Sequence, residues 1–447
     1  MKRFLILLVA TLTILPLATS ALAGGPPPKD ILKGVFISAD AANHTAVFKK
    51  DGSGETVTLT VPDSISFEEV QLERKMLVDL DKHAPDPNTV KHISIMFMNM
   101  TRTKVIALIV IGLIGGLLSG FIGSGGAFVL TPAMMSLGAP GAVAVASNMC
   151  HKFPKAMVGT YKRFKYGQVD IKLAAVMAVT AVLGVQIGIQ IQKYILNHWG
   201  NAGSNLYVSV VFVFVLIFVG GYVLMDAIKL SKGSDDNTAA GPAPFALKMQ
   251  KINLPPMMHF KVAKVTISAW ITVPVGLATG MLAATIAVGG FIGVPGMIYV
   301  IGASAVVASA TELGIAFLMG AWGSIQWGIS GLIDIRMTLL ILSASLIGVQ
   351  LGALGTTYVK DHMIKLVMSA VMLIVAVSRG AKIPGYLAAL DLRAPLTSGN
   401  AALLESVSFW ALIAALATAG IIISVAMFIG ISKDRAEKRA ELAISRG

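Results

Sequence analysis

The chain of 447 residues carries little charge and almost no cysteine. Asp, Glu, Lys and Arg make up only 13% of it and hydrophobic residues 55%, a balance outside the range of soluble globular domains. The single cysteine, Cys150, excludes an intrachain disulfide. Its apolar neighbours favour a small buried side chain over a catalytic or metal-binding thiol. The composition therefore predicts a protein with several membrane-spanning segments.

The chain also lacks the short motifs of common enzymes. It contains no Walker A sequence, which argues against an ATP-driven pump, and no H-E-x-x-H, C-x-x-C or G-x-S-x-G pattern. We therefore expect no enzymatic activity, no cofactor and no metal. The net charge of +13 could suggest nucleic acid, but the charges lie in loops between apolar runs, as in cytoplasmic loops of membrane proteins. We expect a lipid bilayer as the partner, and not a nucleic acid.

The N-terminus has the parts of a secretory signal. Basic Lys2 and Arg3 precede the apolar run 4–17, and Ala21-Leu22-Ala23 is a cleavage site, so the mature chain is expected to begin near Gly24. An uncleaved anchor is the alternative, and in both cases the next segment is exported. Residues 24–100 are polar and turn-rich, with about five strand-like runs. They predict a small extracytoplasmic β-domain, barrel or sandwich, for which a periplasmic partner stays open.

Long apolar runs separated by short breaks follow this β-domain. The first group of expected helices is 105–120, 127–137, 142–159, 173–191 and 206–228, and the second is 262–287, 290–301, 303–322, 337–356 and 363–377. A last span is expected at 409–431. We divide the chain into a signal peptide (1–23), β-domain (24–100), membrane repeat 1 (101–230), cytoplasmic linker (231–261), membrane repeat 2 (262–380), extracytoplasmic loop (381–407), additional transmembrane helix (408–431) and cytoplasmic tail (432–447).

The two groups of helices are copies of one another. Shifting 125–188 forward by 164 positions places it without a gap on 289–352. Gly125-Gly126 then falls on Gly289-Gly290, Asp170-Ile171 on Asp334-Ile335, and Gly-Val-Gln-x-Gly (184–188) on the same motif at 348–352. Many secondary transporters are built from such internal repeats.

Charge predicts that the two copies are inverted. The stretch 151–172 contains six lysines and arginines, whereas its counterpart 315–336 contains only Arg336, so the two face opposite sides of the membrane. The linker and the tail are also basic and are expected in the cytoplasm. The predicted fold is an all-α polytopic membrane protein, an inverted-repeat transporter with broken or short helices, plus the N-terminal β-domain. A homo-oligomer stays open.

Substrate is expected at the glycine-rich breaks. Irregular backbone at membrane depth must face protein or a wet cavity, and a helix that restarts there offers free N–H groups and a positive dipole to an anion. Close helix packing is the alternative role of these glycines. The candidate residues at the breaks are Gly123, Ser124, Gly125, Gly126, Gly289 and Gly290.

Polar side chains inside the predicted helices complete the candidate site. Ser147, Asn148 and Thr311 are substrate candidates, as are Gln186 and Gln350, for which packing between helices is the alternative. Glu312 is the proton-coupling candidate, because a charged residue inside a span costs about 2.5–3.5 kcal/mol on insertion scales. A neutral, hydrogen-bonded acid is the other interpretation. His151, Lys152 and Lys155 line an anion path or extend to the interface. Asp170 and Asp334 each open a helix and are expected to be N-caps.

Several of these motifs resemble a known family. Gly-Phe-Ile-Gly-Ser-Gly-Gly-Ala-Phe-Val-Leu-Thr-Pro (120–132), the Leu-Gly-Ala-Pro and Ala-Val-Ala-Ser-Asn that follow, Tyr-Gly-Gln-Val-Asp-Ile-Lys (166–172) and Gly-Val-Gln-x-Gly (184–188) resemble the TauE/SafE sulfite exporter family. The likeness covers about 105–380. In place of the family's usual Thr-Ser after the turn, this chain has Ala-Ser-Asn and Ala-Thr-Glu, and the exported domain and extra helix are unusual.

The resemblance implies a bacterial inner-membrane permease with two homologous halves that moves sulfite, a sulfonate or another sulfur oxyanion. We expect a secondary transporter for a small anion that works by alternating access, with its N-terminal domain in the periplasm and its tail in the cytoplasm. A passive anion channel of the same fold is one alternative. A membrane sensor or assembly protein whose β-domain binds a partner is another.

Overall fold

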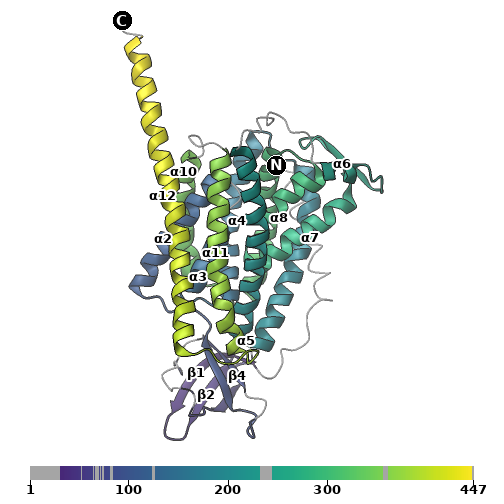
Figure 1. The fold of residues 1–447 in the computed structure, drawn as a ribbon. Coiled ribbons are helices and arrows are strands. Elements are labelled where there is room, and N and C mark those ends of the chain that lie inside the picture. Colours follow the sequence, from purple (N-terminus) through teal and green to yellow (C-terminus); the bar gives the residue numbers. More distant parts are fainter. Residues whose placement is uncertain are drawn as a thin grey trace.

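The computed structural model describes residues 31–51, 53–63, 65, 70, 72, 75–80, 84–122, 126–231, 244–355 and 361–444. The predicted signal peptide and the predicted break residues Gly123, Ser124 and Gly125 lie outside these ranges. Figure 1 shows a bundle of helices with a small sheet at one end and α6 at the other. We call the end with the sheet the β-domain side. The other end is the hairpin side, named for the two-stranded hairpin 257–268 that follows α6.

The β-domain is one antiparallel sheet. Its strands are β1 (Ile31–Asp40), β2 (Thr45–Lys50), β3 (Thr56–Thr60), β4 (Lys75–Leu80) and β5 (Val90–Ile95), in the order β3-β2-β1-β4-β5. The edge strands approach one another at a bridge between Thr60 and Thr89, so the sheet curls toward a barrel. Phe36 and Phe48 fill its core with ring centroids 4.9 Å apart. The five predicted strands are thus confirmed, and the sheet is a single layer rather than a sandwich.

The first repeat contains α2 (Arg102–Ile122), α3 (Ala127–Ser136), α4 (Gly141–Lys165) and α5 (Ile171–Ser231). The last of these is two helices in sequence, because the backbone at Gly200 is non-helical (φ 58°, ψ −157°). Residues 171–231 therefore form two membrane-length helices that meet at Gly200, which agrees with the two spans predicted from the sequence.

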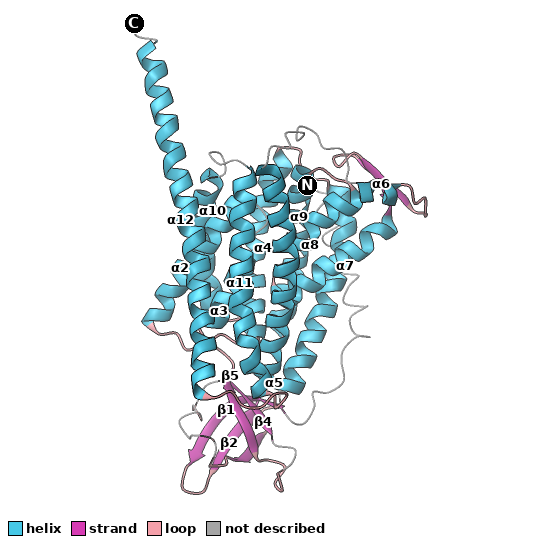
Figure 2. Cartoon of the chain, in the orientation of Figure 1, coloured by secondary structure: helices cyan, strands magenta, loops and turns pink. Residues whose placement is uncertain are grey.

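The second repeat follows a small connection seen in Figure 2, formed by α6 (Pro244–Gln250), β6 (Met257–Phe260) and β7 (Val265–Ser268). It contains α7 (Ala269–Ile286), α8 (Gly290–Pro295), the π-helix η3 (Gly296–Ile301), α9 (Ala305–Ile329), α10 (Ile335–Gly355) and α11 (Asp361–Ala389). Helix α12 (Ser398–Ile444) closes the bundle. In the described part of the chain, seven helices, α5 among them, are long and apolar enough to cross a membrane.

The end of the chain is more helical than expected. Most of 381–407, predicted as a loop, belongs to α11 and α12, and α12 continues past the predicted span to Ile444. Arg379 interrupts the apolar run of the sequence, but α11 continues past it, and this arginine is fully buried and hydrogen-bonded to Ser136. The charged stretch 433–443 is rich in Ala, Glu, Lys and Arg, which are strong helix formers.

The two repeats pack reciprocally. Helix α2 lies against α10 of the other repeat, and α7 lies against α5. A Cβ at Gly348 on α10 would overlap the carbonyl oxygen of Leu113, and a Cβ at Gly184 on α5 would overlap that of Leu277. These two contacts are related by the same shift of 164 positions, on helices that start from opposite ends of the bundle (Figure 1). The glycines of the repeated motif therefore allow close helix crossings.

Candidate functional site

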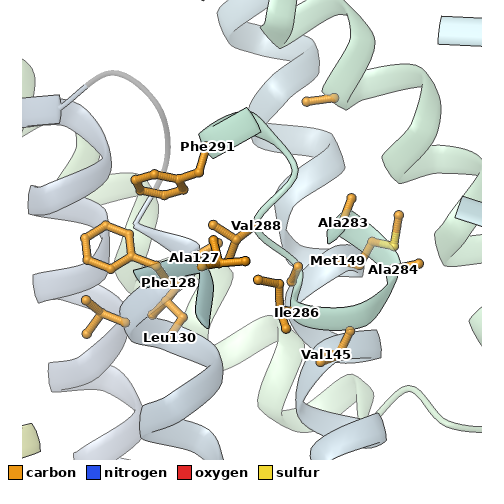
Figure 3. Packing of buried hydrophobic residues seen from close by; sticks show 14 of the residues in the cluster. Ala127, Phe128, Leu130, Val145, Met149, Ala283, Ala284, Ile286, Val288 and Phe291 are labelled. Atoms are coloured by element: carbon orange, nitrogen blue, oxygen red, sulfur yellow. The ribbon is translucent and has the colours of Figure 1, made fainter. Parts of the chain in front are cut away.

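The two broken helices meet at the centre of the bundle. In repeat 1, α3 restarts after Gly126, and in repeat 2, α8 restarts after a left-handed Ala287 (φ 60°) and Gly289. Phe128 and Phe291 follow the two restarts and form an edge-to-face pair with centroids 5.0 Å apart (Figure 3). Both half-helices therefore begin within the protein interior, next to each other.

A cavity of about 290 Å³ lies beside these half-helices. Seven of the predicted site residues line it, namely Gly126, His151, Lys152, Lys155, Gly290, Glu312 and Gln350. Lys162, Arg163 and Tyr166 extend its wall toward the hairpin side, where Lys172 of the next helix donates a hydrogen bond to the His259 carbonyl (3.1 Å). The cavity is at the small end of the range for ligand pockets.

Helix α4 supplies a cationic wall. Its lining residues recur every three to four positions, which places them on one face of the helix. Its charged members are Lys152, Lys155, Lys162 and Arg163, and the His151 imidazole lies beside them. No carboxylate lies within ion-pair distance of these five among the residues that the structure describes. A wall of unpaired cations in a low-dielectric cleft attracts a small anion. Lys162 and Arg163 follow Lys155 by seven and eight positions, a spacing that keeps them on the same helical face and could have indicated them, although they lie beyond the predicted helix 142–159.

Glu312 is the one carboxyl group among the described residues of the cavity wall. It is 4% exposed, and neither carboxyl oxygen has a hydrogen-bond partner within the described ranges. Its side chain lies against the backbone of α8, since a Cβ at Gly293 would overlap Oε2. A buried carboxylate without partners is costly, whereas the neutral acid is less so.

Asn148 serves the scaffold rather than the cavity surface. Its Nδ2 donates to the carbonyl of Ala127 (3.1 Å) and to Oγ1 of Thr131 (2.7 Å), so α4 is joined to the start of α3. Its Oδ1 lies 3.1 Å from Nδ1 of His151, and Nε2 of that ring lies 3.1 Å from Oγ of Ser345 on α10. The imidazole at the cavity wall is therefore held between two helices.

Ser147 and Thr311 join the repeats instead of lining the cavity. The Asp170 N–H donates to Oγ1 of Thr311 (3.1 Å), and the Asp334 N–H donates to Oγ of Ser147 (3.0 Å). These are the same bond in the two repeats, since 147 and 311, and 170 and 334, are 164 positions apart. The carboxylates accept from the N–H groups of Leu173 and Met337, which confirms both predicted N-caps.

The two equivalent glutamines have different surroundings. Gln350 is exposed at the cavity wall, whereas Gln186 is 3% exposed and accepts a hydrogen bond from Nε1 of Trp322 (3.2 Å). Gly289 also lies outside the cavity wall, packed against the Thr279 carbonyl and Met319. The wall of this cavity thus includes Gln350 of the second repeat but not the equivalent Gln186 of the first.

A model of the sulfite exporter TauE/SafE family matches residues 108–379. The chain belongs to this family. It is therefore a multi-pass membrane protein of a transporter family for sulfur anions, and not of an enzyme family. No curated protein and no solved structure matches it. The β-domain and α12 lie outside the matched range. They are therefore additions to the family's membrane part, one before it and one after it in the chain.

Proposed function

We propose that this protein is a secondary transporter that moves a small sulfur oxyanion, such as sulfite or a sulfonate, across the bacterial inner membrane by alternating access. The observation that carries the proposal is the unpaired cationic wall of α4 on a cavity that ends at two facing half-helices. Gly126 and Gly290, at the half-helix starts, line this cavity together with Lys152 and Lys155. Helix N-termini and lysines are both suited to a compact anion.

Alternating access is supported by the difference between the repeats. We interpret the cavity, which includes Gln350, as a path open toward the hairpin side, and the buried hydrogen bond between Trp322 and Gln186 as the closure of the equivalent path on the β-domain side. Exchanging the conformations of the two repeats would open the second path and close the first. A passive channel would need both paths open together.

Export is the favoured direction. The cations of α4 have uncharged counterparts on α9, which are Ile315, Ala316, Met319, Gln326 and Trp327. An anion bound on the hairpin side would thus meet fewer cations once the other side opens, and would be released there. With the basic loops in the cytoplasm and the β-domain in the periplasm, release is outward. Glu312 is the proton-coupling residue of this cycle.

Flux in proteoliposomes tests the function. Sulfite, thiosulfate, sulfate and sulfonates are compared with and without an imposed pH gradient, on the wild type and Glu312→Gln. The transporter should concentrate at least one sulfur oxyanion when only the pH gradient is supplied, and the variant should lose that dependence. Dissipative flux alone would indicate the channel, and no flux of any of these anions would refute the proposal.

A further inference from the structure

The two half-helices are attached to their neighbours in different ways, although the repeats are equivalent. Asn148 on α4 corresponds to Glu312 on α9, and Ala127 on α3 corresponds to Phe291 on α8. Thr131, the second partner of Asn148, corresponds to Pro295. Two of the three groups thus change their hydrogen-bonding capacity, because Glu312 replaces Asn148 and Pro295 replaces Thr131, whereas the backbone carbonyl of Ala127 has an equivalent at Phe291.

The attachment of α3 does not depend on protonation. The Asn148 amide carries two N–H donors at any physiological pH, and its Nδ2 donates to both Ala127 and Thr131. Asn148 and Thr131 are both fully buried, so solvent does not compete for these bonds. Helix α3 is therefore held against α4 throughout.

The attachment of α8 requires a proton. Pro295 has no N–H, so the Phe291 carbonyl one turn earlier lacks its donor within the helix. The next N–H, that of Gly296, bonds instead to the carbonyls of Ile292 and Gly293. Glu312 lies against this turn at Gly293, but a carboxylate only accepts hydrogen bonds, whereas a carboxylic acid donates one. Only the protonated Glu312 side chain can donate a hydrogen bond to α8, as Asn148 donates to α3 in the other repeat.

The α8–η3 segment is also the less regular of the two half-helices. It changes from α- to π-helix at Gly296, begins after left-handed Ala287 and ends at left-handed Gly302 (φ 93°). Helix α3 is α-helical over its ten residues. Short π-helical segments and positive-φ residues mark places where a helix can rearrange at low cost.

We infer that Asn148 is a positioning residue that holds α3 permanently, whereas α8 and η3 form the moving gate, held closed against α9 only while Glu312 carries a proton. The inference rests on the proposed function, because the α8–η3 gate controls access to the cavity only if the protein is a transporter. Proton release frees α8 from α9, and proton uptake restores the contact.

Other charged groups near Glu312 lie on two helices. Helix α4 presents Lys152, Lys155 and His151 to the same cavity, and Asp170 precedes α5, where its carboxylate is already bound by the N–H groups of Val262 and Ala263. Helices α7 and α8 have no ionisable side chain, and η3 has only Tyr299, which packs edge-to-face against Tyr222. Lys152 and its neighbours favour the charged form of Glu312, so they promote release of α8 after deprotonation.

Hydrogen–deuterium exchange of the full-length protein in lipid nanodiscs tests this inference. Exchange of 290–301 and 127–136 is compared between pH 5.5 and 8.5, after correction for the intrinsic rates. We expect protection of 290–301 to fall at least 10-fold as the pH rises, while 127–136 stays constant. In Glu312→Gln, whose amide donates at every pH, 290–301 should stay protected. Asn148→Asp, or Thr131→Val if that variant does not fold, should loosen 127–136 instead.

Gln350→Glu, which adds a carboxyl elsewhere on the cavity wall, is the matched control and should leave both segments as in the wild type. Equal pH dependence of the two segments, or none in either, would overturn the inference. This outcome is distinct from failure of the proposed function. If flux depends on pH but α8 does not, the transporter stands and the gate is wrong. If α8 responds but no sulfur oxyanion moves, the gate stands and the assigned substrate class is wrong.

Discussion

Gln186 and Gln350 are equivalent residues of the two repeats, and one is buried against Trp322 while the other is exposed in the cavity. Identical sequence motifs in inverted copies would be equally exposed if the two paths were in the same state. Under the proposed alternating-access mechanism, the difference corresponds to a state that is open on the hairpin side and closed on the β-domain side. It also indicates that the Gln186–Trp322 bond belongs to the closed path.

The first prediction concerns this closed path. Trp322→Phe keeps the aromatic ring but removes the N–H that bonds to Gln186, so the closed path should open more often. In a Cys150→Ser background, a cysteine introduced by Gln326→Cys should then be labelled by a maleimide several-fold faster. Trp410→Phe, on an exposed part of α12, is the control. Equal labelling of the two variants would show that the bond does not contribute to closure.

The second prediction concerns the bonds that cross between repeats. Ser147→Ala and Thr311→Val each leave a buried N–H, that of Asp334 or Asp170, without its acceptor, at a cost of about 1–3 kcal/mol. Each should lower the thermal unfolding midpoint of the purified protein. Ser343→Ala, an exposed serine that bonds only to its own helix, should leave the midpoint unchanged. An unchanged thermal unfolding midpoint in all three variants would contradict a stabilising role of the bonds between the repeats.

The third prediction separates packing glycines from tolerant ones. Gly184→Ala and Gly348→Ala would each place a methyl group on the backbone of the helix opposite, so little folded protein should be recovered. Gly221 lies in the second of the two α5 helices, in open space, so Gly221→Ala should gain about 0.5–1 kcal/mol of helix stability. Monodisperse yield in detergent measures the difference. Similar yields of the three variants would mean that the crossings tolerate wider spacing.

The fourth prediction concerns the cationic wall. Removing one charge–anion hydrogen bond costs about 1.5–3 kcal/mol, so Lys152→Gln or Lys155→Gln should raise KM for the transported anion by ~10-fold or more. Lys165→Gln is the matched control, because Lys165 lies on α4 outside the cavity wall and over the Tyr161 ring. The effect of the cavity variants should shrink at high salt. An equal KM for Lys155→Gln and Lys165→Gln would place the anion elsewhere.

The sequence predicts this fold well because its signals are local or repeated. Apolar runs mark the spans, alternation and turn residues mark the five strands, and one shift of 164 positions relates the halves. The same shift also extends toward the N-terminus, where Gly112 and Gly116 fall on Gly276 and Gly280. These glycines lie in the same two helix crossings, α2 with α10 and α7 with α5. The predicted span 363–377 ends before Arg379, whereas α11 continues to Ala389 with Arg379 buried, which the sequence pattern does not reveal.

The site was harder to predict, because polar residues in a helix do not reveal which neighbour they face. Ser147 and Thr311 have the spacing of cavity residues, yet their partners are backbone groups 187 and 141 positions away. Asn148 and Glu312 are equivalent by sequence, but only the structure shows that one has partners and the other has none in the described chain. Such differences depend on tertiary contacts and not on local pattern.

The last prediction concerns contact between the β-domain and the membrane part. Burial, reinforced by the like charge of Lys193 at the end of an α5 helix, lowers the pKa of Lys33 from 10.5 to about 8, while Asp51 acts in the opposite direction. The folded protein thus releases this proton more readily than the unfolded chain. Between pH 8 and 10.5 the unfolded state binds more protons, so stability should rise with pH across that window.

Amine acylation followed by peptide mass spectrometry measures this directly, because only the neutral amine reacts. The rate at Lys33 should be half-maximal near pH 8 in the folded protein. In denaturant, the midpoint should move toward 10.5. Lys193→Gln removes the like charge, so it should raise the midpoint in the folded protein without restoring the full value, since burial remains. An unchanged midpoint in Lys193→Gln would show that the β-domain does not rest on α5 in solution.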